Sequence, residues 1–244
     1  MVNRPIIQKI WAGIANVFIP KTQGAYTVCE SLKEIFSDKY SIDFEVIRNL
    51  PFSKIRKVKK QDKERKIILY QGALNEGRGL EEMIAAMPEL VSCELWLAGE
   101  GDLSLQLREQ TQKIGVEERV KFLGLVFPEK LAEITAQADI GLNLLKNSGL
   151  NYYYSLANKT FDYIQAGIPA IHMNFPEYQI VNEQYNIGIL ISDSEIKTIQ
   201  SAILELIENQ NLYEQLQENC NQAAQKLTWE NEEKKLITFY NQFI

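Results

Sequence analysis

The sequence is poor in the residues that build metal sites, disulfides and histidine-based catalytic groups. Its 244 residues include three scattered cysteines without CxxC spacing and a single histidine, His172. It has no DxD motif and no His/Cys cluster at metal-ligand spacing. A lone histidine after an apolar run is more often structural than catalytic, and no nucleophile is identifiable near it. We therefore expect no metal, no cofactor and no disulfide framework, and we assign no catalytic residue.

Long apolar runs are absent as well. No stretch approaches the roughly 20 residues that would span a bilayer, and the N-terminus does not resemble a signal peptide. With 45% hydrophobic residues, the chain is able to bury one or two cores. These features predict a globular protein of the reducing cytoplasm.

Negative charge is scarce in the first quarter of the chain. The whole sequence has a net charge of −6, whereas residues 1–60 alone carry +6 and include the basic run KIRKVKK at 54–60. This run is either a solvated linker or a contact with an anionic membrane surface, which would place the protein at the inner face of the membrane. The apolar stretch 6–19 either lies in that interface or forms a core helix. We expect no nucleic-acid partner.

From Arg65 onward, short apolar strands alternate with amphipathic helices. Because parallel strands need a crossover between them, the alternation predicts the α/β class and a parallel, doubly wound, Rossmann-like domain over residues 61–244. Residues 1–60 hold only two candidate strands, in GAYTVC and FEVIRN, and two candidate helices. We interpret 1–60 as the tail of a larger domain or as an edge layer.

Two glycine-containing stretches follow predicted strands. YQGALNEGRGL places Gly72 after the first strand and Arg78 between two glycines at the next helix start, where backbone and guanidinium would both suit a phosphate. The alternative is a glycine turn with a solvated arginine. LAGEGD places Gly99 at the same edge, either beside a ligand or in a tight turn. The dinucleotide fingerprint GxGxxG and the P-loop pattern are both absent.

The stretch SLANKTFDYIQAGIPAIH, residues 155–172, predicts a short helix that leads into a buried strand. Asn158 would cap the helix, Asp162 would lie in its first turn near the positive end, and Gly167 would close it in a left-handed conformation. Asn158, Lys159 and Asp162 would then form an anion site with a carboxylate able to hold a pair of hydroxyls. The alternative is a surface ion pair between Lys159 and Asp162, three residues apart on one helix.

Taken in order, YQGALNEGRGL, LAGEGD, VKFLGLV, ADIGLNLL, SLANKTFDYIQAGIPAI and TWENEEKKLITFY resemble one family over about residues 65–244. They are similar to the C-terminal, donor-binding half of a GT-B glycosyltransferase of the family 4 type, also called glycosyl transferase group 1. The resemblance implies that this half binds a nucleotide-sugar donor and transfers the sugar with retention and without a metal. Glycan or lipid-linked acceptors in surface polysaccharide assembly would suit it.

The resemblance also implies roles for individual residues. Gly72, Arg78 and Gly99 occupy positions of the family's donor-binding site. Of these, Gly72 and Arg78 are at positions that contact the diphosphate of the donor. Asp162 falls at the acidic position that holds the ribose hydroxyls. The loop after VKFLG, with Leu125 and Val126, falls where the base is met.

The sequence departs from the family pattern at several points. Ala73 replaces the arginine that commonly follows the first-strand glycine, and Tyr154 replaces the first acid of the usual acidic pair. The resemblance implies that Lys159, in the variant ANKTFDY, would supply the missing positive charge. Residues 1–60 resemble only the end of the acceptor-binding domain. The chain is therefore either a glycosyltransferase represented by its donor domain or a non-catalytic half that needs a partner chain; an epimerase is a weaker third reading.

Overall fold

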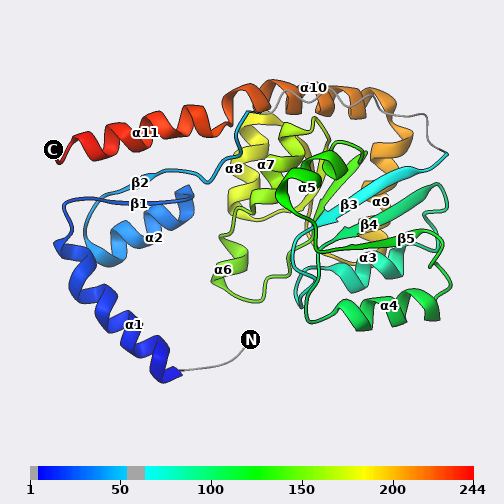
Figure 1. The fold of residues 1–244 in the computed structure, drawn as a ribbon, viewed down its shortest axis with the longest axis horizontal. Coiled ribbons are helices and arrows are strands. Elements are labelled where there is room, and N and C mark those ends of the chain that lie inside the picture. The colour runs from blue at the N-terminus through cyan, green and yellow to red at the C-terminus, as the bar shows by residue number, and fades with distance from the viewer. Residues whose placement is uncertain (1–4, 54–63) are drawn as a thin grey trace. The chain divides into compact units, whose positions relative to one another are not determined.

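The computed structural model describes residues 5–53 and 64–244, which fall into two compact units. The larger unit spans Leu50–Trp229, and the smaller unit joins the segment up to Asn49 to Glu230–Ile244. Figure 1 shows the helices and strands of both units. The basic run 54–60 lies outside the described residues, so the membrane contact expected there stays a prediction. The assignment of 1–60 and 61–244 as separate domains also stays a prediction.

The larger unit is built on a six-stranded sheet with the order β5-β4-β3-β6-β7-β8, in which every pairing is parallel. This confirms the predicted α/β class and the doubly wound sheet. The strands are short and nearly continuous in apolar residues because both faces of the sheet are covered. Their bounds are β3 Lys66–Gln71, β4 Cys93–Ala98, β5 Val120–Gly124, β6 Ile140–Asn143, β7 Ala170–Met173 and β8 Gly188–Ile191.

Alternate side chains of β3 pack into different cores. Ile68 and Tyr70 join the core that includes residues of α3, α4 and α9, whereas Ile67 and Leu69 join the core that includes residues of α5 and α7. Helices therefore cover both faces of the sheet (Figure 1). The helices of this unit are α3 Leu80–Ala86, α4 Ser104–Lys113, α5 Pro128–Thr135, α6 Leu150–Tyr153, α7 Asn158–Gln165, α8 Pro176–Tyr185, α9 Ile196–Glu208 and α10 Gln210–Lys226.

The strand order reverses between β3 and β6, which lie side by side at the middle of the sheet. The chain leaves β3 toward one edge and returns through β6 toward the other, so the loops after these strands diverge. In open α/β sheets, ligands bind outside the carboxyl ends of the strands at such a reversal. A ligand site is therefore expected at the loop after β3 and the start of α7.

Tyr163 anchors α7 on the sheet. Its hydroxyl donates to the carbonyl oxygens of Leu69 (3.0 Å) and Leu142 (3.2 Å), which belong to neighbouring strands. Its ring lies so close over Gly141 that a Cβ at that position would overlap the ring atoms. The absence of a side chain at Gly141 thus lets α7 approach β6.

The start of α7 corrects two sequence predictions. The helix begins at Asn158, and the residue in the cap position is Ala157, which has no capping side chain. The expectation that Asn158 caps the helix is therefore wrong, and Asp162 lies in the second turn rather than the first. The backbone N–H of Ala157 instead donates to the Tyr178 hydroxyl at 3.1 Å, a contact from α8 that local sequence does not reveal. The left-handed Gly167 is confirmed, with φ of 64°.

The smaller unit contains a two-stranded parallel sheet of β1 Ala25–Thr27 and β2 Phe44–Val46, joined through α2 Glu30–Tyr40. The strand and helix predicted in GAYTVCESLKEIFSDKY and the strand in FEVIRN are confirmed. Helix α1, Pro5–Phe18, leads through the short 3-10 helix η1, Ile19–Lys21, into β1. The last helix, α11 Trp229–Asn241, contributes its residues from Glu230 onward.

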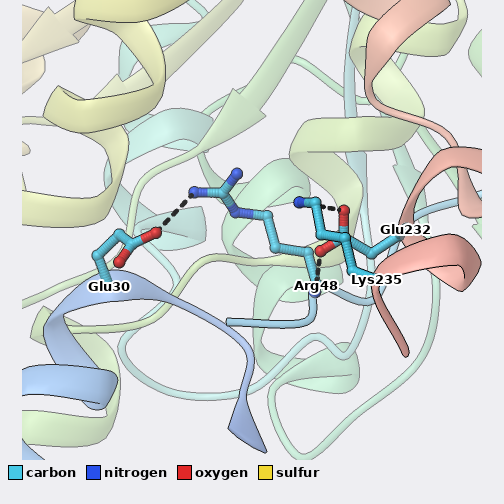
Figure 2. A network of polar contacts seen from close by, with 4 residues as sticks. All are labelled: Glu30, Arg48, Glu232 and Lys235. Atoms are coloured by element: carbon cyan, nitrogen blue, oxygen red, sulfur yellow. Dashed lines mark hydrogen bonds and ion pairs between the residues drawn. The ribbon is translucent and has the colours of Figure 1, made fainter. Parts of the chain in front are cut away.

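A polar network joins the two ends of the chain within the smaller unit (Figure 2). The backbone N–H of Arg48 donates to Glu232 at 2.8 Å, and Lys235 pairs with the same carboxylate at 2.8 Å. The Arg48 guanidinium reaches Glu30 at 4.0 Å. Because Glu232 is buried, these partners offset the cost of removing its charge from water.

We expect Gly141→Ala to lower the free energy of unfolding by about 1–3 kcal/mol, since the added methyl group must displace the Tyr163 ring. Urea unfolding monitored by circular dichroism would measure the change. Gly13→Ala is the matched control, because a Cβ there meets no atom within 4 Å. An unchanged unfolding midpoint for Gly141→Ala would contradict the anchoring role of Tyr163.

Candidate functional site

The loops after β3 and β4 meet at the carboxyl edge of the sheet. Gly72 donates its backbone N–H to Ala98 O at 2.9 Å, and a Cβ on Gly99 would overlap the Gly72 carbonyl oxygen. Gly72 and Gly99 have φ of +130° and +152°, which other residues adopt rarely. Side chains are therefore excluded here, and bare backbone faces the neighbouring α7.

Lys159 enters this edge from the first turn of α7. Its side chain is buried, with 9% of the residue exposed, and Nζ lies 3.7 Å from the centroid of the Tyr70 ring. A Cβ on Gly72 would lie 3.5 Å from Nζ, so the lysine and the glycine loop are direct neighbours. Nζ has no hydrogen-bond partner among the residues that the structure describes. The alternative of a surface ion pair with Asp162 is therefore wrong.

Arg78 adds a second positive charge. Its guanidinium carbon lies 4.9 Å from the centroid of the Tyr152 ring, and its Nε is buried without a hydrogen-bond partner in the described part of the chain. Burial, and then the charge of Arg78, hold the pKa of Lys159 well below its usual range. Two cationic groups that repel each other in the free protein would both be stabilised by an anion between them.

His172 lies next to this cluster, on β7. It is 1% exposed, and its ring stacks on Tyr178 with centroids 5.0 Å apart. Burial, with a smaller contribution from the charge of Lys159, lowers its pKa to about 3, so the ring is neutral at physiological pH. Tyr178 accepts from Asn143 Nδ2 at 2.7 Å as well as from Ala157 N. The network fixes the start of α7 and therefore the position of Lys159.

Asp162 is held by a second network, about one turn further along α7. Its carboxylate accepts from Gln71 Nε2 at 2.7 Å, and Gln71 Oε1 accepts from Thr135 Oγ1 at 2.8 Å. Gln71 is buried at the end of β3, so it links α7 to α5 through the sheet. The carboxylate is thus positioned by an amide, and a carboxylate accepts several hydrogen bonds at once.

A cavity of about 170 Å³ lies beside Asp162, between α5 and α7. Most of its wall is apolar, and Asp162, Thr135 and Gln165 add polar groups. Phe52 and Pro51 border it from the chain segment before the larger sheet. A cavity of this kind suits a flat, partly polar group attached to a hydroxyl-bearing ring at Asp162.

The structure brings four of the predicted residues together, namely Gly72, Gly99, Arg78 and Lys159. Asp162 follows one turn after Lys159 on α7. Asn158 is exposed at the first position of α7. Leu125 and Val126 lie on a different loop, between β5 and α5, where Leu125 is 82% exposed and Val126 packs against the core beneath α5. Nothing in the structure assigns a ligand to any of them.

Several residues of the site escaped the sequence analysis, among them Tyr70, Gln71, Asn143 and Tyr178. Two of them carried a usable signal, because Gln71 and Asn143 are polar residues in otherwise apolar strands. A buried amide in a strand has to find a partner, which marks it as part of a network. Tyr70 and Tyr178 gave no comparable signal, since aromatic residues are common in any core.

Across 5–53 and 64–244, no group of three or more His, Cys, Asp and Glu side chains is arranged to hold a metal ion. No helix in these same ranges has the length and apolar character needed to cross a membrane.

The parallel sheet, with a glycine-lined and cationic carboxyl edge, defines a Rossmann-like domain of the GT-B type. Residues 51–227 match the family described as glycosyl transferases group 1, and the chain belongs to this family. The chain is 26% identical over 190 residues to the uncharacterized glycosyltransferase MJ1607 of Methanocaldococcus jannaschii, covering 76% of this chain and 47% of that protein. It thus spans about half the length of its curated relative.

Solved structures show the same fold. The Anabaena protein Alr3699/HepE, in complex with UDP, superposes with a TM-score of 0.79 at 15% identity, covering 96% of this chain and 67% of that one. Sucrose-phosphate synthase from Thermosynechococcus elongatus gives 0.80 at 17% identity, covering 99% and 64%. At these identities, the likeness concerns the fold alone.

Burial of Lys159 predicts a pH-dependent stability. Because its pKa is lower in the folded state, the unfolded chain binds a proton that the folded chain lacks, between the folded pKa and about 10.4. The free energy of unfolding therefore gains up to about 1.4 kcal/mol per pH unit from this group as pH rises through that window. His172 contributes nothing above about pH 7.5, since it is then neutral in both states.

Urea unfolding across the alkaline range would test this, with Lys159→Met compared with the wild type. The variant should be more stable, and its advantage should shrink as pH rises. Lys113→Met, at an exposed position on α4, is the matched control and should show no such trend. An equal pH slope for wild type and Lys159→Met would contradict the lowered pKa of the buried Lys159.

Proposed function

We propose that this chain is the donor-binding half of a glycosyltransferase that moves a sugar from a nucleotide-sugar to an acceptor. The observation that carries the proposal is the buried, unpartnered Lys159 beside Arg78 and the bare backbone of Gly72. A diphosphate would supply the missing counter-charge. It would bridge the two cations and accept from Nζ, the guanidinium and a backbone N–H at the start of α7, which begins at Asn158.

The nucleoside would extend from this diphosphate toward Asp162. Its ribose hydroxyls would donate to the Asp162 carboxylate, which Gln71 already holds in place at 2.7 Å. The adjoining cavity between α5 and α7 provides room next to the ribose. Leu125 and Val126 would contact the base from the β5–α5 loop. Gly99 keeps the glycine loop close enough for the sugar-phosphate to approach.

Chemically, the site would act on the leaving group. When the bond between the sugar and the diphosphate breaks, the diphosphate oxygen takes the electron pair and gains charge. Arg78, Lys159 and the helix start would stabilise that charge more than they stabilise the intact donor. This requires no metal, no cofactor and no protein nucleophile, in keeping with front-face transfer with retention.

The partners follow from the same proposal. HepE has been solved with UDP and with UDP-glucose, which makes UDP the first nucleotide to test here. A partner chain that supplies the acceptor-binding half would be required if this chain is a non-catalytic half. A glycan or lipid-linked acceptor of surface polysaccharide assembly, on the cytoplasmic side of a membrane, fits the proposal. The proposal also includes contact of the basic run 54–60 with that membrane.

A non-catalytic nucleotide-sugar binding half is the second candidate. One observation favours it: within the described residues, the smaller unit has a parallel sheet of only two strands. Parallel sheets are usually larger and covered on both faces, so this unit offers little scaffold for acceptor recognition. The two candidates share the donor site and differ in turnover.

Calorimetric titration with UDP, GDP and ADP tests the donor site. We expect one nucleotide to bind saturably, and Arg78→Ala and Lys159→Met each to weaken binding about tenfold or more, since a hydrogen bond to a charged group contributes about 1.5–3 kcal/mol. Asp162→Asn should weaken the nucleotide but not inorganic pyrophosphate, because its partner is the ribose. Binding should also take up protons, since a diphosphate raises the pKa of Lys159.

Lys197→Ala, on the exposed side of α9, is the matched control and should bind as the wild type does. Equal losses of nucleotide and pyrophosphate affinity in Asp162→Asn would overturn the ribose assignment. If none of the three nucleotides binds, the proposed donor site is wrong for this chain.

Turnover separates the two candidates. We expect the wild type, incubated with the nucleotide-sugar that binds, to release nucleoside diphosphate in the presence of a glycan acceptor, and Arg78→Ala to release it at least about tenfold more slowly. A coupled assay for the released nucleotide would follow the reaction. Tight binding without release would favour the non-catalytic half.

A further inference from the structure

Helix α1 presents an unpartnered apolar face in the smaller unit. None of its 14 residues is buried. Its large apolar side chains recur every three to four residues and therefore share one side of the helix. All seven are exposed, and Trp11 retains 65% of its accessible surface: Ile6, Ile7, Ile10, Trp11, Ile14, Val17 and Phe18. A continuous apolar face of this size in water marks an interaction surface.

The charges around this face have one sign. The opposite side of the helix carries Gln8, Lys9 and Asn16, and Lys21 follows in η1. No Asp or Glu precedes Glu30 in the chain. An apolar face with a tryptophan, flanked by lysines and free of acids, complements a lipid surface with anionic headgroups.

The length of α1 decides how it would bind. Fourteen residues of helix span about 21 Å, which is shorter than the hydrocarbon core of about 30 Å. The helix would therefore lie in the interface, with its apolar face toward the acyl chains. A second copy of the chain would also cover this face, but it would bring the same lysines together, which opposes that pairing.

We propose that α1 docks the smaller unit on an anionic lipid surface, with Ile10, Trp11 and Ile14 inserted and Lys9 and Lys21 at the headgroups. The proposed docking surface consists of residues of the smaller unit alone, so lipid binding by α1 is independent of the donor site. The proposal chooses the interface over the core helix for the apolar stretch 6–19, because no residue of α1 is buried, and it assigns the docking to this helix rather than to 54–60.

Flotation of the full chain with vesicles tests the docking. We expect binding to phosphatidylcholine vesicles that contain one quarter phosphatidylglycerol, weaker binding to phosphatidylcholine alone, and a loss of binding in high salt. Ile10→Glu/Ile14→Glu should lower the bound fraction about tenfold or more. Gln8→Glu/Asn16→Glu, the matched control, adds the same charges on the other side and should lose less. Since no residue of α1 is buried, both variants should keep the fold.

Tryptophan fluorescence gives a second readout. A blue shift with the anionic vesicles, absent in Trp11→Phe, would place Trp11 in the lipid. Equal losses in the two double variants would overturn the proposal. So would an absence of vesicle binding, whether the protein stays monomeric or forms a dimer that Ile10→Glu/Ile14→Glu dissociates.

Discussion

Holding the ammonium group of Lys159 away from water without a counter-ion opposes folding, so the surrounding structure has to keep it there. The Tyr70 ring offers a cation–π contact at 3.7 Å, and the glycine loop leaves space for the side chain. Tyr163 fixes α7 on the sheet, and Tyr178 fixes its first turn. Each of these contacts comes from a different element. The site is therefore a product of the whole sheet rather than of one loop.

The surroundings of Lys159 have low polarity, which makes its charged form unfavourable in the free protein. The same low polarity would strengthen its attraction to a bound anion. Coulombic attraction is strong where water is excluded, and the donor groups would not need to reorganise when charge develops on a leaving diphosphate. Asp162 complements this arrangement, because Gln71 donates a hydrogen bond to it, Thr135 in turn donates to Gln71, and the carboxylate lies at the wall of a cavity. Lys159, with Arg78 beside it, lies one helical turn from the oriented carboxylate of Asp162. This arrangement suits an extended ligand that has an anionic group at one end and hydroxyl groups at the other.

The two units differ in how they relate to the family. The match to the glycosyl transferases group 1 covers residues 51–227, which nearly coincides with the larger unit, Leu50–Trp229. The smaller unit combines both ends of the chain, and the buried Glu232 joins them through Arg48 and Lys235 (Figure 2). Such a junction holds the ends together without building a large core. Helix α1 has no buried residues, and this exposure is the basis of the proposed docking on lipid.

The sequence alone determined the order of strands and helices in the larger unit, since apolar periodicity reflects burial and burial is locally encoded. It also determined the left-handed Gly167, because few residues other than glycine adopt that conformation. Only the tertiary structure decided that Lys159 is buried rather than paired at the surface, that Ala157 rather than Asn158 precedes α7, and that Gln71 reaches Asp162. Those contacts join residues up to 91 positions apart, so they depend on strand order and on which helices cover each face. The local sequence pattern carries no information about such tertiary contacts, because it describes how each segment folds and not which segments become neighbours.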